Sequence, residues 1–107
     1  MVSAETERLL GEFEKVAERA DQALARLSKR LGETLRRPPN LSLLAVLTLK
    51  QELRNDLETG ERCVQRLREN HHSADEERRS HDAFLVRKST LAIQLRVTRL
   101  AEILMVL

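Results

Sequence analysis

At 107 residues the chain is long enough for one domain with a modest core, and its 2% of aromatic residues mean that Leu, Ala and Val build that core. Three Gly, two Pro and few β-branched residues exclude a sheet protein and predict an all-α fold. A formal net charge of +2 with 34% charged residues indicates a surface of mixed sign, and not the basic field of a nucleic-acid tail.

A first helix is expected over residues of about 4–36, with Ser3 as its N-cap. Ala17 and Ala20 predict a close approach by a neighbouring helix. The stretch "RRPPN" ends the helix, because Pro38 forces the residue before it out of the α region. The predicted apolar stripe, with alternating spacings of three and four, comprises Leu10, Phe13, Ala17, Ala20, Leu24, Leu27 and Leu31.

A second helix is expected over residues of about 41–70, with Asn40 as its N-cap. Its later turns are ordinarily amphipathic, and Gly60 in its interior indicates a close helix contact. Its first turns are apolar around almost the whole circumference, through Leu41, Leu43, Leu44, Val46, Leu47 and Leu49.

A third helix is expected over residues of about 74–107, because Ser73 and Glu76 form a capping box. The alternative is one continuous helix from Leu41 to the end of the chain, which would give a long helical hairpin that oligomerises. The third helix has two apolar stripes. One comprises Val86, Ile93, Val97, Leu100, Leu104 and Leu107, and the other comprises Phe84, Leu91, Leu95, Met105 and Val106.

Short connections predict an antiparallel, coiled-coil-like bundle of three helices in a single domain, 1–107. The end of the first helix, the start of the second and the end of the third then share one pole, at Pro38 and Pro39. Because three helices shield only their inward stripes, we expect a partner at this pole, either a second copy or another subunit. The alternative is that the first two helices wrap both sides of the third.

The predicted function is a non-enzymatic helical protein–protein interaction module, a subunit or adaptor of a larger assembly. Apolar anchors would set its affinity, and arginine–carboxylate pairs at the rim would set its register. The residues expected to contact the partner are Leu43, Leu44, Val46, Leu47, Leu100, Ile103, Leu104 and Leu107.

No catalytic, metal or cofactor site is expected. The metal-like residues lack the paired spacing of a zinc site, and the chain has no Gly-rich phosphate loop. These residues are His71, His72, His81, Cys63 and Asp82. The carboxylates lie among arginines at helical spacing, where pairing within a helix explains them. These residue types and their spacing therefore argue against an enzyme.

The alternative function is association with nucleic acid through an arginine stripe. Interleaved carboxylates and the lack of aromatic residues for base stacking argue against it. The stripe would comprise Arg62, Arg66, Arg78, Arg79, Arg87, Lys88, Arg96 and Arg99.

The single cysteine, Cys63, cannot form an internal disulfide, so we expect the reducing environment of the cytoplasm or the nucleus. The opening "MVSAETERLL" is too acidic for a signal or transit peptide, and no apolar run reaches the length of a membrane span. An ending in the middle of a helical pattern is consistent with a fragment of a longer protein.

In general shape the expected bundle resembles the three-helix modules of spectrin-type repeats and of tubulin-binding cofactors. The chain departs from a typical spectrin repeat because it has no Trp. The resemblance implies a helical bundle and carries no function.

Overall fold

The computed structural model describes residues 4–34, 43–70 and 75–106 of the chain. They form three long helices: α1 (Ala4–Thr34), α2 (Leu43–Asn70) and α3 (Glu76–Val106). The expected caps Ser3, Asn40 and Ser73 and the "RRPPN" stretch lie outside these residues. The expected all-α, three-helix bundle is confirmed.

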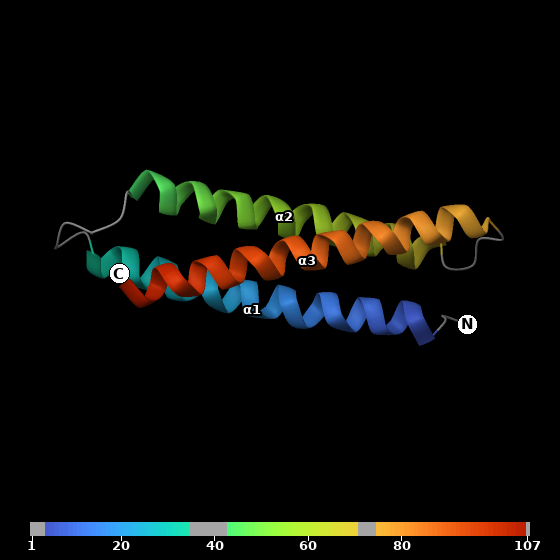
Figure 1. The fold of residues 1–107 in the computed structure, drawn as a ribbon, viewed down its shortest axis with the longest axis horizontal. Helices are drawn as coiled ribbons and strands as arrows, with labels where there is room; N and C mark the ends of the chain where they lie inside the picture. Colours follow the sequence, from blue (N-terminus) through green and yellow to red (C-terminus); the bar gives the residue numbers. More distant parts are fainter. Residues whose placement is uncertain (1–3, 35–42, 71–74, 107) are drawn as a thin grey trace.

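The helices run antiparallel in chain order and form an elongated bundle of 57 × 19 × 16 Å. In Figure 1 the end of α1, the start of α2 and the end of α3 lie together at one end of the molecule, as expected for the pole. Because α2 and α3 are separate helices that pack side by side, the alternative of one continuous helix is wrong.

Asp75 starts α3. Its Oδ1 accepts a hydrogen bond from the backbone N–H of Arg78 at 3.2 Å, which is the geometry of an N-cap. Glu76 and Glu77 follow in the first turn, where the positive end of the helix dipole favours carboxylates.

α3 is the central helix. It packs extensively against both α1 and α2, whereas α1 and α2 touch each other far less. The core therefore lies along the inner side of α3. It comprises Leu9, Phe13, Val16, Ala20, Ala23, Leu24, Leu27, Val46, Leu53, Leu57, Val64, Leu67, Val86, Ile93 and Leu100.

The stripe expected on α1 is partly wrong. Leu9, Val16 and Ala23 are buried but were not among the expected stripe residues, while Leu10 and Ala17 are only half-buried at its edge. The stripe is thus rotated slightly about the helix axis, because α1 packs mainly on α3.

Gly60 on α2 is a close helix contact, as its position in the sequence predicted. A Cβ atom at this position would lie 2.9 Å from Cζ of Phe13 on α1, nearer still to Cε2, and 3.4 Å from Cβ of Ser89 on α3. A side chain of any kind would therefore overlap the buried Phe13 ring. All three helices meet at this glycine.

Candidate functional site

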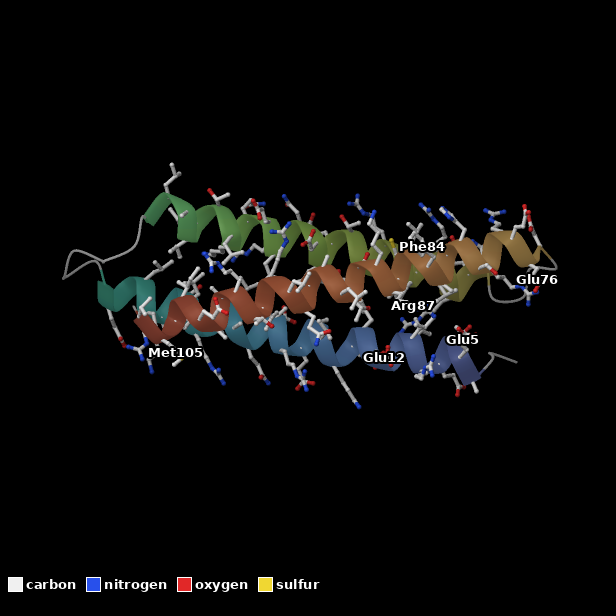
Figure 2. The ribbon with its side chains drawn as sticks, viewed as in Figure 1. Glu5, Glu12, Glu76, Phe84, Arg87 and Met105 are labelled. Atoms are coloured by element: carbon white, nitrogen blue, oxygen red, sulfur yellow. The ribbon has the colours of Figure 1, made fainter. Side chains whose placement is uncertain are left out.

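The outer face of α3 is the main candidate for a functional surface. We use this name for Phe84, Leu91, Leu95, Met105 and Val106, whose exposed fractions run from 55% for Leu91 to 87% for Met105. Figure 2 labels Phe84 towards one end of α3 and Met105 towards the other. Five large apolar side chains on one helix are thus exposed to solvent, which is the usual mark of an interface.

Helical periodicity produces this face. Phe84, Leu91 and Leu95 are spaced by seven and four residues, so they fall within about 40° of one another around the helix. Lys88 lies between Phe84 and Leu91 on the same side of the helix, and Glu102 lies seven residues after Leu95. Together with the apolar residues they form a heptad-like seam. The two stripes expected on the third helix are therefore both present.

The opposite side of α3 faces the core. Val86, Ile93 and Leu100 are fully buried, and Val97 and Leu104 pack against the same cluster. The alternative that the other two helices wrap α3 is right in that α3 is central. It is wrong for the outer face, because α1 and α2 both pack on the inner half and leave that face exposed.

Two ion pairs join α1 to its neighbours. Arg87 on α3 donates to Glu5 on α1 at 3.3 Å, and Arg68 on α2 donates to Glu14 on α1 at 3.2 Å. Figure 2 shows Arg87 extending from α3 towards Glu5. These pairs are about half exposed, so each contributes little to stability, but they help to set the register of the helices.

Arg96 on α3 forms a stronger pairing with α2. Its guanidinium donates to both Asp56 and Glu52, one turn apart on that helix. The hydrogen bond with Asp56 is the main reason that the pKa of Arg96 is raised, and the charges of Asp56 and Glu52 add to it against a smaller opposing effect of burial. Because the shift is upward from an already high pKa, Arg96 stays charged throughout the ordinary pH range.

The residues expected to contact a partner at the pole divide into two groups. Leu44 and Leu47 on α2 are exposed, at 74% and 43%. Val46 and Leu100 are core residues, so neither meets a partner while the bundle is closed.

The other four expected contacts are either half-buried or lie where no side chain is described. Ile103 and Leu104 are half-buried against the core. Leu43 is the first residue of α2, but its side chain lies outside the described residues, as does Leu107. Within the part of the chain that is described, the pole offers fewer exposed anchors than the outer face of α3.

The apolar pattern of the third helix in the sequence already indicates the outer face of α3. The second stripe of α3 is present in the sequence, whereas the contacts expected from the sequence lie at the pole, where residues are apolar all round. The pattern of such a segment does not indicate which side of the helix faces the core. The sequence alone therefore does not distinguish the buried Val46 from the exposed Leu44.

Two of the grooves on the described part of the chain lie between helices. The first, of about 430 Å³, lies between the starts of α1 and α3 and is lined by Leu9, Arg79 and Phe84 among others. The second, of about 450 Å³, lies between α1 and α2, with Phe13 and Val64 at its base and carboxylates such as Glu18 at its rim. Both have mixed polar and apolar linings.

Two polar contacts join α2 and α3. Asp82 on α3 is buried and accepts a hydrogen bond from Nδ2 of Asn70 at 3.1 Å, which joins the end of α2 to α3. Ser89 Oγ contacts the half-buried Sγ of Cys63 at 4.0 Å. Among the described residues no group of three His, Cys, Asp or Glu side chains could hold a metal ion.

The expected arginine stripe is divided by these pairings. Arg87 and Arg96 are paired with carboxylates on other helices, and Arg99 pairs with Glu102 at 3.3 Å along α3 itself. Each of these arginines has a neighbouring carboxylate that would oppose a phosphate group.

None of the described helices is long and apolar enough to cross a membrane.

Comparisons of the chain with models of known protein families, with curated proteins and with solved structures found no match.

Proposed function

We propose that this chain is a non-enzymatic helical interaction module, a subunit or adaptor that binds a protein partner through apolar helix faces. The observation that carries the proposal is the outer face of α3, where Phe84, Leu91 and Leu95 lie in one exposed row. Burying such side chains is favourable by roughly 1.5–3 kcal/mol each relative to leaving them exposed.

The pole extends the proposed contact. Met105 and Val106 end the outer face there, and Leu44 and Leu47 are exposed at the start of α2. The apolar side chains would anchor the partner. Lys88 lies within the row and would pair with a carboxylate of the partner, whereas Arg87 and Arg99 flank the row and already have carboxylates of their own chain beside them.

A photo-crosslinking residue at position 95 tests the proposal. Benzoylphenylalanine replaces Leu95 in one variant and the exposed Lys29 of α1 in a matched control, and cells expressing each are irradiated. We expect a covalent adduct at position 95 that protease removes and nuclease leaves intact, with little adduct at position 29. Equal adducts at both positions, no adduct at 95, or a nuclease-sensitive adduct would each contradict the proposal.

A further inference from the structure

We propose that the partner of the outer face is a second copy of this chain, bound antiparallel with its two-fold axis at Leu95. This inference rests on the proposed function, because it names the occupant of the same surface. A two-fold contact of this kind is isologous, so each residue on one copy must face a suitable residue at the mirrored position on the other.

The sequence of the outer face is self-complementary about Leu95. Phe84 and Val106 lie eleven residues on either side of it, so each apolar side chain would face the other across the interface. Lys88 and Glu102 lie seven residues on either side of Leu95, so Lys88 of each copy would face Glu102 of the other. The dimer would therefore contain two such pairs of opposite charge. Leu91 would lie beside the aliphatic stem of Arg99.

A parallel pairing lacks this complementarity. It would place Lys88 against Lys88 and Glu102 against Glu102 within the seam, where like charges repel. The charges on the outer face therefore favour the antiparallel arrangement.

The exposed area is sufficient for a dimer. At roughly 150–200 Å² for a large apolar side chain, the five residues of the outer face expose on the order of 500–600 Å² per copy. Two copies would then bury about 1,000–1,200 Å² of apolar surface, and the stems of Arg87, Lys88 and Arg99 add to it. The total reaches the lower end of the range for specific interfaces.

Within the described residues, neither α1 nor α2 obstructs this contact. α1 and α2 both pack on the inner half of α3, which leaves its outer side exposed along its length. The row from Phe84 to Val106 spans about 33 Å of helix. Two such helices would pack as the central layer of a six-helix assembly.

The first test is the mass of the full chain by sedimentation from about 1 to 500 µM. We expect the mass to rise from 12.3 kDa towards twice that value. Lys88→Glu and Glu102→Lys should each weaken the dimer about tenfold, because each creates two like-charge contacts. The double variant should restore the affinity to within about threefold of the parent, since the pairs are re-formed with reversed sign.

Lys29→Glu serves as the control, because Lys29 is an exposed cation on α1 and lies outside the outer face of α3. It should leave the dimer unchanged, and circular dichroism should show the parental helix content in every variant. A dimer that is insensitive to both charge reversals, or that the double variant does not restore, would overturn the antiparallel arrangement.

A cysteine at the axis gives a second readout. In a Cys63→Ala background, Leu95→Cys should cross-link with its own copy when an oxidant is added, because only a residue at the axis meets itself. Leu91→Cys should not, since its two copies would lie about 12 Å apart along the helices. Cross-linking at 91 but not at 95 would contradict the axis.

The two proposals fail in different ways. A chain that is monomeric at every concentration, but that forms a photo-adduct with another protein at position 95, keeps the proposed function and overturns the second copy as its partner. A monomer without any adduct at position 95 overturns both.

Discussion

Gly60 shows at the residue scale how closely the three helices pack. Its α-carbon faces the Phe13 ring of α1 and Ser89 of α3, which leaves no room for a methyl group without displacing the ring. Glycine normally weakens a helix interior by about 1 kcal/mol relative to alanine. Here the close packing outweighs that cost, because interiors are dense and added atoms force side chains out of position.

We expect Gly60→Ala to lower the free energy of unfolding by roughly 1–2 kcal/mol, since overpacking exceeds the gain in helix propensity. Gly11→Ala in α1 is the matched control, because a Cβ atom there meets nothing within 4 Å. It should raise the free energy of unfolding by about 0.5–1 kcal/mol. Urea denaturation measures both, and stabilisation by Gly60→Ala would show that the Phe13 ring moves aside freely.

At the scale of single elements, α3 has two apolar faces with different roles. The inner face, with Val86, Ile93 and Leu100, holds the bundle together. The outer face contributes nothing to that core in a single copy of the chain. Arg96 lies between the two faces and fixes the register of α3 on α2 through Asp56 and Glu52.

We expect Ile93→Ala to cost about 2–4 kcal/mol of unfolding free energy, because it leaves a cavity in the core. Leu95→Ala, two residues along the same helix, should change it by less than about 0.5 kcal/mol at concentrations where the chain is monomeric. Urea titrations of the two variants make the comparison. Equal losses would mean that the outer face is covered within a single copy.

At the scale of the whole molecule, positive and negative side chains are interspersed and frequently paired. The net charge is only +2, and ion pairs link α1 to α2, α1 to α3 and α2 to α3. An apolar surface on such a molecule associates with little dependence on salt, because its attraction comes from the release of water and not of counterions. These features favour the proposed contact with protein over contact with phosphate.

We therefore expect weak retention on heparin, with elution below about 0.3 M salt, and a dimer whose affinity changes less than about threefold between 0.05 and 0.5 M salt. Heparin chromatography and sedimentation in the two buffers check this. Retention with a steep dependence on salt would favour the arginine stripe and nucleic acid.

The sequence by itself determined the helical fold, the two faces of α3 and the close contact at Gly60, and it favoured three helices over one continuous helix from Leu41. These follow from composition and from the 3.6-residue period, which are properties of each segment alone. Only the tertiary structure decided which residues of α2 enter the core, because Leu44, Val46 and Leu47 lie in a segment that is apolar all round. Only the packing of α1 and α2 on one side of α3 selects Val46 for the core and leaves the outer face of α3 exposed.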